Sequence, residues 1–581
     1  MIRKVIIFCL TAVMVTAVNA QETTYRILHE CDTTVSAQAA GISIGSRDAH
    51  YIIYEYPSKD IDGKPVTISG IVLIPADVAD GSVPCDGVIL HNRLTVDDES
   101  EVPSRGGKGL LVPSFILASP LKPNYIVVAS DYIGYGSSRD RNMAYFCGDT
   151  NARTSLDGLI AARQMLTDKG QPLGKYQFNI GYSQGGTVAM YVAKLRDQEY
   201  KDKGINFDKT FVGNGVLDCE KAYSEFMKRD AMPEWRDVAM FLVSVNENYN
   251  LGIDYKDIFK EPVASLIPEF IKKKDKAVLS PEKVGKVDSL HQVLQPEYMD
   301  VRSEKVKVLL RKLAEIKLAA GWEPDITQNY YITHSRHDDY IPVQCARELL
   351  KWMRAKGFKP SLVPGKTSLQ TNMLVFKLNH MSSLAVWAIQ TLAAIQFWPV
   401  IYYEGEQNRY YHAVVKDLNL MKTIRYLEGM GIDVRALASG LSGSRDTGKG
   451  SSMNIFDVIG KISDVLAKAD LTITDFYEML EDSGITIQDI LEVVNYVTSA
   501  PATPATAAKE VSATPAKAAK EAPATPAAAA KEAPAVSSVF YDTEMSQEAK
   551  AALYMLRQYE ETLAKWYQIA GYDVKYNLWS W

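Results

Sequence analysis

A serine held between glycines is the strongest chemical signal in the sequence. Ser183 lies in residues 181–185, which read GYSQG. The apolar residues 177–181 are typical of a buried strand, and a helical pattern follows from residue 187. A serine at such a tight strand-to-helix turn can present its hydroxyl outward, and the glycines are needed because any side chain there would collide with the neighbouring strand and helix. The pattern therefore predicts a nucleophilic serine.

A nucleophilic serine needs a base, and the base needs an acid that orients it. His380 lies just before a helical pattern that starts at about residue 384. Asp338 follows the predicted strand 329–333, and Asp339 beside it is the alternative acid. We expect His380 to be the base and Asp338 to be the acid, with Asp339 left open.

Attack by the serine creates an oxyanion, which needs N–H donors. One expected donor is the backbone amide of Gln184, the residue after the nucleophile. The other is expected from residues 90–94, in the amide of Asn92 or of Arg93. Chemistry of this kind needs no cofactor, and the wide, irregular cysteine spacing does not predict a metal site.

Several short motifs resemble those of the α/β-hydrolase superfamily. Residues 334–342 (HSRHDDYIP) are similar to the H-G-x-x-D-x-x-V-P stretch of these enzymes, with Ser335 where glycine is usual. Residues 131–138 (DYIGYGSS) resemble their D-x-x-G-x-G-x-S loop. The resemblance covers about residues 47–398 and is nearest to the secretory lipase and esterase branch. It implies hydrolysis of carboxylic esters by a triad of Ser183, Asp338 and His380.

The elements around these motifs predict an α/β fold, with a mostly parallel sheet flanked by helices. A hairpin of residues 51–56 and 66–74, with a turn at Asp62-Gly63, is expected to open the sheet. Beyond it, short apolar runs alternate with helical patterns, as in parallel sheets covered by helices. The apolar runs are residues 87–90, 125–130, 177–181, 210–213 and 329–333, and the helical patterns are residues 155–166, 185–196 and 343–356.

The alternation stops between the sixth and seventh strands, which predicts a helical cap over the sheet. Aromatic and aliphatic residues in this segment favour a pocket for an apolar acyl group. The predicted organisation is a signal peptide (1–20), a first core part (21–216), the cap (217–326), a second core part (327–400), a mostly helical extension (401–498), a linker (499–537) and a C-terminal amphipathic helix (538–581).

The N-terminus has the pattern of an export signal. Arg3 and Lys4 precede an apolar run that ends near small residues, which predicts cleavage after Ala20. The run is shorter than the ~20 residues that a membrane-spanning helix needs. We therefore expect an exported protein, periplasmic or secreted, with no transmembrane span. Five cysteines remain beyond the signal, so at least one thiol is free or pairs between chains.

The C-terminal part is dominated by an alanine-, proline-, lysine- and glutamate-rich linker. Proline recurs too often for one long helix, and the other residues cannot build a core, so a semi-rigid spacer is expected. The helix after it has one apolar face. We expect this face to dock on the same chain; the alternative is an unknown partner.

The expected function is that of an exported serine esterase or lipase, acting on a small-molecule or lipid ester. A serine peptidase or a polysaccharide deacylase could use the same residues. A non-catalytic surface-binding protein on a hydrolase scaffold is the alternative of another class. The formal net charge of −6 and the absence of a basic block argue against nucleic acid as a partner.

Overall fold

The computed structural model describes residues 24–361 except 40–41, 120, 230 and 233, then 369–374, 378–396 and 398, and single residues between 423 and 493. The signal peptide (1–20), the linker (499–537), the C-terminal helix (538–581) and nearly all of the extension (401–498) lie outside the described residues. These four assignments stay predictions.

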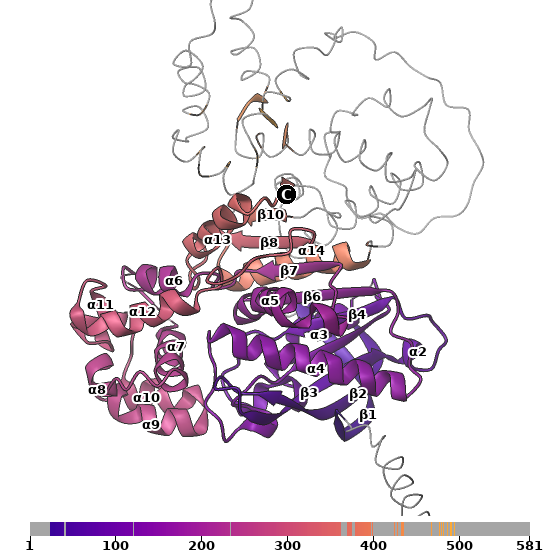
Figure 1. The fold of residues 1–581 in the computed structure, drawn as a ribbon, viewed down its shortest axis with the longest axis horizontal. Helices are drawn as coiled ribbons and strands as arrows, with labels where there is room; N and C mark the ends of the chain where they lie inside the picture. The colour runs from indigo at the N-terminus through magenta and orange to yellow at the C-terminus, as the bar shows by residue number, and fades with distance from the viewer. Residues whose placement is uncertain are drawn as a thin grey trace, which may run out of the picture.

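One mixed sheet of ten strands organises the described part of the chain (Figure 1). The first four strands in spatial order, β1, β2, β3 and β5, pair antiparallel, and every pairing from β5 to β9 is parallel. The spatial order is β1-β2-β3-β5-β4-β6-β7-β8-β10-β9. The strands are β1 (Arg26–Ala39), β2 (Ile42–Lys59), β3 (Pro65–Pro75), β4 (Gly87–Asn92), β5 (Tyr125–Ser130), β6 (Tyr176–Tyr182), β7 (Lys209–Gly213), β8 (Tyr330–Ser335), β9 (Pro360–Ser361) and β10 (Leu369–Leu374).

The predicted hairpin is present as β2 and β3, but it does not open the sheet. The strand β1 precedes it and pairs with β2 over nearly its whole length. Most β1 side chains are exposed, so the strand lacks the apolar pattern by which a strand is predicted from sequence. The prediction that residues 51–56 form the first strand was therefore wrong.

Helices cover both faces of the sheet. The helices α4 (Gly148–Asp168), α5 (Gln184–Leu195) and α13 (Val343–Ala355) pack on one face, and α3 (Leu111–Leu117) and α14 (His380–Gln396) pack on the other. Successive residues of the central strands are apolar and point to opposite faces, so each strand contributes to the core on both sides of the sheet. This arrangement brings the carboxyl ends of the parallel strands to one edge.

A group of helices between β7 and β8 forms a lobe beside the sheet, left of it in Figure 1. Its large apolar side chains, including Phe226, Trp235 and Phe241, are buried and continue the core of the α4 and α5 face. The helices are α6 (Cys219–Phe226), α7 (Trp235–Asn248), α8 (Tyr255–Ile258), α9 (Val263–Lys273), α10 (Pro281–Val284), α11 (Pro296–Met299) and α12 (Lys307–Ile316). We call this group the cap.

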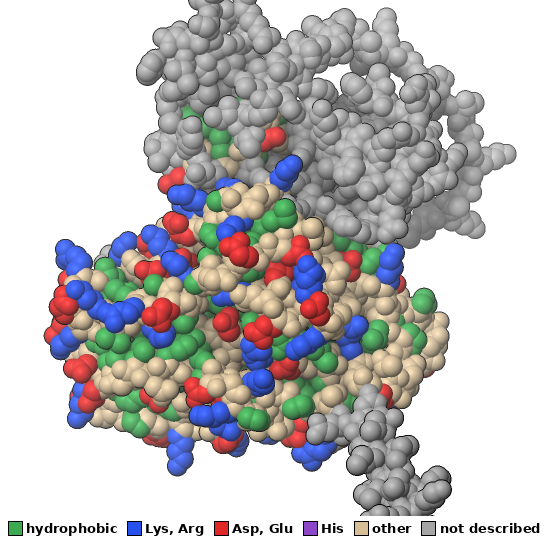
Figure 2. Space-filling model, viewed as in Figure 1, with side chains coloured by type: hydrophobic (Ala, Val, Ile, Leu, Met, Phe, Trp, Pro, Cys, Tyr) green, Lys and Arg blue, Asp and Glu red, His purple; other side chains and the backbone are tan. Residues whose placement is uncertain are grey.

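The visible surface carries acidic and basic side chains that are intermingled, without a large patch of either sign (Figure 2). Among the described residues, no helix combines the length and the apolar character needed to cross a membrane. The five cysteines of the described part are all free thiols.

Candidate active site

Ser183 occupies the junction between β6 and α5. Its backbone has a φ of 56° and a ψ of −123°, a conformation that costs a non-glycine residue about 1–3 kcal/mol. A Cβ on Gly181 would lie 2.0 Å from the carbonyl oxygen of Gly185, and one on Gly185 would lie 2.1 Å from that of Asn92. The two glycines therefore allow the close approach of strand and helix that produces this turn.

Asp338 and His380 come together after the ends of β8 and β10. The Nδ1 atom of His380 lies 2.8 Å from Oδ2 of Asp338. The Asp338 carboxylate also accepts the backbone N–H groups of Tyr340 and Ile341, each at 2.7 Å, and the side-chain amide of Asn214. The acid is thus fixed on several sides and can hold the imidazole in one orientation.

The environment of Asp338 keeps its carboxyl group ionised. Burial alone would raise its pKa, but the hydrogen bond and charge of His380, the charge of His334 and the N–H of Ile341 outweigh burial and lower the pKa below its usual value. An ionised acid beside Nδ1 leaves the other ring nitrogen of His380 available as a base.

Asp339 has a different position from Asp338. Asp339 is exposed, and its Oδ1 accepts the backbone N–H of His380 at 2.7 Å. His380 is the first residue of α14, so the predicted start of this helix near residue 384 was wrong. Asn379, whose Oδ1 accepts the N–H of Ser382 at 2.8 Å, begins the helix earlier.

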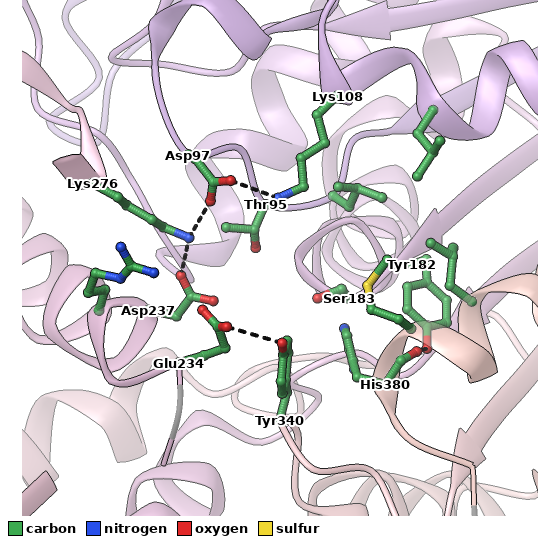
Figure 3. A pocket seen from close by; sticks show the side chains of 15 residues that line it. Thr95, Asp97, Lys108, Tyr182, Ser183, Glu234, Asp237, Lys276, Tyr340 and His380 are labelled. Carbon is green, nitrogen blue, oxygen red and sulfur yellow. Dashed lines mark hydrogen bonds and ion pairs between the residues drawn. The ribbon is translucent and has the colours of Figure 1, made fainter. Parts of the chain in front are cut away.

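Two tyrosines that the sequence did not single out contact the imidazole. The Tyr340 ring stacks on His380 with a centroid distance of 4.9 Å and an interplanar angle of 20°. The Tyr182 ring lies 5.1 Å away, and its hydroxyl donates to the His380 carbonyl at 2.6 Å. Figure 3 shows His380 between these two rings. Both tyrosines neighbour predicted site residues, Ser183 and Asp339, which is the only signal that could have indicated them.

Ser183 and His380 line one cavity of about 250 Å³ (Figure 3). The core side of this cavity includes Leu94, Leu111, Met381 and Leu384. The cavity therefore exposes the candidate nucleophile and base to the same small volume, next to apolar side chains.

The residues expected to supply the oxyanion donors precede or follow lining residues in the chain but are not among the lining residues themselves. Gln184 is the first residue of α5, where backbone N–H groups have no partner within the helix. Asn92 is fully buried, and its side-chain amide donates to Asn179 at 2.7 Å. The residues of this loop that line the cavity are Leu94 and Thr95. The amides of Gln184, Asn92 and Arg93 remain predictions as oxyanion donors.

Arg93 is a buried cation that fixes the loop after β4. Its guanidinium lies over the rings of Tyr132 and Tyr135, 4.4 and 4.9 Å from their centroids. It also donates to the carbonyl of Asp131 at 3.1 Å and to the side chain of Gln184 at 3.2 Å. The D-x-x-G-x-G-x-S loop is therefore tied through Arg93 to the turn that carries Ser183.

Charged side chains form the part of the cavity that faces the cap. Lys276 pairs with Asp97, at 2.9 Å, and with Asp237, and Lys108 pairs with Asp97 at 3.1 Å. The Tyr340 hydroxyl donates to Glu234 at 3.1 Å. The described cap residues that line the cavity are all charged; these are Glu234, Arg236, Asp237 and Lys276. The large apolar cap residues, whose presence favoured an apolar acyl group, pack in the core. The preference for such a group stays a prediction.

Within the described part of the chain, no three histidine, cysteine, aspartate or glutamate side chains are placed so that they could hold a metal ion. The groups at the candidate site are a strained serine, a histidine, an ionised aspartate and a helix N-terminus.

Comparison with solved structures identifies the fold. A protein from Legionella pneumophila described as a putative hydrolase superposes with a TM-score of 0.54 at 17% identity, covering 66% of this chain and 99% of that one. The rice cell wall degrading esterase LipA from Xanthomonas oryzae gives 0.48 at 20% identity (57% and 88% covered), and Candida antarctica lipase A gives 0.43 at 14% (64% and 82%). No sequence-family profile and no curated protein sequence matches the chain. The predicted fold is confirmed.

Proposed function

We propose that this protein, whose fold is that of the α/β hydrolases, is an exported serine hydrolase that cleaves carboxylic esters. The observation that carries the proposal is the 2.8 Å contact between His380 and the ionised Asp338, beside a cavity that Ser183 also lines. A strained serine, an imidazole and an oriented acid at one cavity are the parts that nucleophilic acyl transfer requires.

In the proposed reaction, His380 takes the proton of Ser183 as the hydroxyl oxygen attacks the ester carbonyl. Asp338 holds the tautomer and stabilises the imidazolium that forms. The N–H of Gln184 and an amide of the loop after β4 receive the oxyanion. The imidazolium then protonates the leaving alcohol, and water, activated by the same histidine, releases the acid from the acyl-enzyme.

The position of Asp338 supports a catalytic role over a purely structural scaffold. A buried carboxylate is costly to ionise, and here four donors keep it charged beside a histidine that faces a cavity. A surface-binding protein that only kept the scaffold would have no use for that arrangement. The N-terminal signal pattern supports export.

The test is hydrolysis of p-nitrophenyl esters of increasing acyl length by the mature protein and by Ser183→Ala. We expect the substitution to lower kcat by about 10³-fold or more, because the nucleophile is lost. Ser265→Ala is the matched control, since this serine is exposed on α9. Ser183→Ala with unchanged turnover, or a wild-type protein that cleaves amides faster than matched esters, would contradict the proposal.

A further inference from the structure

The charged wall of the cavity has a balance that constrains its ligand. Among the described residues, it contains three acids, Asp97, Glu234 and Asp237, and three bases, Lys108, Arg236 and Lys276. In Figure 3 the labelled members lie across the cavity from Ser183 and His380. Because the formal charges cancel, a ligand with net charge of either sign would be repelled by half of the wall.

Four of these six side chains form ion pairs with one another. The other two, Glu234 and Arg236, can still form hydrogen bonds with a ligand. Lys276 connects Asp97 and Asp237, and Lys108 also pairs with Asp97. Glu234 accepts one hydrogen bond, from the Tyr340 hydroxyl, and so keeps further acceptor sites. Arg236 lines the cavity and has no hydrogen-bond or ion-pair partner among the described residues, so its guanidinium keeps N–H donors for a ligand.

A wall of this kind disfavours an alkyl chain. Contact with an alkyl chain would remove water from Arg236 and Glu234 and return no hydrogen bond, which is unfavourable. A hydroxyl group both donates and accepts, so a neutral group with several hydroxyls can satisfy a carboxylate and a guanidinium at once. The apolar side chains at the other part of the cavity, such as Leu111 and Leu384, suit a short acyl group.

We propose that the substrate is a short-chain acyl ester of a polyhydroxylated alcohol such as a sugar, and that Arg236 and Glu234 form hydrogen bonds with its free hydroxyls. The inference rests on the proposed ester hydrolysis and specifies its substrate class. The hydroxyls belong to the alcohol side, because a polyol esterified at one oxygen keeps its other hydroxyls. Arg236 and Glu234 are specificity-determining residues in this assignment, and neither takes part in proton transfer.

The test compares two acetate esters of matched shape. One is a methyl glucopyranoside acetylated at its primary hydroxyl, and the other is cyclohexylmethyl acetate, which has the same ring size and linkage without ring hydroxyls. The readout is the ratio of kcat/KM for the sugar ester to kcat/KM for the cyclohexyl ester. We expect a ratio well above one for the wild-type protein. Arg236→Met should lower it about tenfold, through loss of charge-assisted hydrogen bonds.

Two further variants complete the design. Glu234→Gln should lower the ratio by a smaller factor, because the amide still accepts the Tyr340 hydroxyl but loses the charge. Arg302→Met, which removes an exposed arginine of the cap paired with Asp300, should leave the ratio unchanged. A wild-type ratio near or below one, or a ratio that Arg236→Met does not alter, would overturn the inference and leave ester hydrolysis standing. If the protein hydrolyses neither of these two esters and no p-nitrophenyl ester, both the inference and the proposed ester hydrolysis are overturned.

Discussion

At the residue scale, burial distinguishes the two adjacent aspartates Asp338 and Asp339, one beside the imidazole and one at the start of a helix. Asp338 is 8% exposed, and its carboxylate contacts the imidazole of His380. Asp339 is exposed, and its side chain accepts the backbone N–H of the same histidine. The first can stabilise a charge that appears on the ring during reaction, whereas the second positions the start of α14.

The two aspartates should therefore differ strongly when each is replaced by asparagine. Asp338→Asn should lower kcat by about 10³–10⁴-fold, because an amide favours the wrong imidazole tautomer. Asp339→Asn keeps an acceptor for the backbone N–H and should lower kcat by less than about tenfold. Ester hydrolysis with both proteins at matched folding, checked by circular dichroism, measures the difference. Equal losses would contradict this separation of roles, and a larger loss for Asp339→Asn would assign the acid role to Asp339.

Local pattern could indicate Ser183, Asp338 and His380 because each follows a recognisable strand or precedes a helix. It could not indicate Arg236 or Lys276, which lie in the cap far from these motifs in the sequence. Their approach to the cavity depends on how the cap packs on the core, and no local periodicity encodes that. The apolar residues of the cap correctly indicated that the cap is packed on a buried core, but they did not indicate which cap residues line the cavity.

At the scale of elements, Lys276 connects the cap to the core. Its backbone N–H donates to the Asp97 carbonyl at 3.0 Å, and its ammonium group pairs with Asp97 of the core and Asp237 of α7. Burial alone would lower the pKa of Lys276, but the two carboxylates outweigh burial and raise it. The pKa of Asp97 is likewise lowered by Lys276 and Lys108 against the effect of burial.

Lys276→Met should destabilise the protein by about 1–3 kcal/mol at pH 7. This is less than the ~3–5 kcal/mol for a fully buried pair, because the Asp97 side chain is 46% exposed. The depressed pKa of Asp97 contributes stability above its unfolded value of about 3.9, and that contribution is lost as the pH falls through the lower folded value. The contribution from the raised pKa of Lys276 is fully present at pH 7 and below, and is lost only in alkali. The difference between variant and wild type should thus shrink as the pH falls below about 3.9.

Urea unfolding at pH 7 and near pH 3 measures this difference, for a two-state transition. Lys305→Met is the matched control, since its exposed ion pairs on the cap should contribute no more than about 1 kcal/mol. A destabilisation by Lys276→Met that stays constant or grows in acid would show that the ion pairs are not its cause.

At the scale of the whole molecule, the parallel half of the sheet was predictable and its antiparallel edge only partly. The strands β4 to β8 are buried, so each reads as a short apolar run. The outer strand β1 is exposed along most of its length and has no comparable signal. Composition predicted the linker and signal peptide, which lie outside the described residues.

Export can be tested on the intact protein. Expression of the full chain in a bacterium with a general secretion pathway should yield a mature protein that begins at Gln21, because cleavage is expected after Ala20. Intact mass and N-terminal sequencing of the periplasmic and medium fractions give the result. A chain that keeps Met1 and stays in the cytoplasmic fraction would contradict export without affecting the proposed chemistry.

The central claim is that Ser183 is an activated nucleophile, and covalent labelling tests it most directly. The mature protein is incubated with a fluorophosphonate probe, and the modified residue is mapped by peptide mass spectrometry, beside Ser183→Ala and the Ser265→Ala control. We predict one label per chain on Ser183, retained in Ser265→Ala and lost in Ser183→Ala. A folded protein that takes no label, or a label on any other serine, would contradict the account.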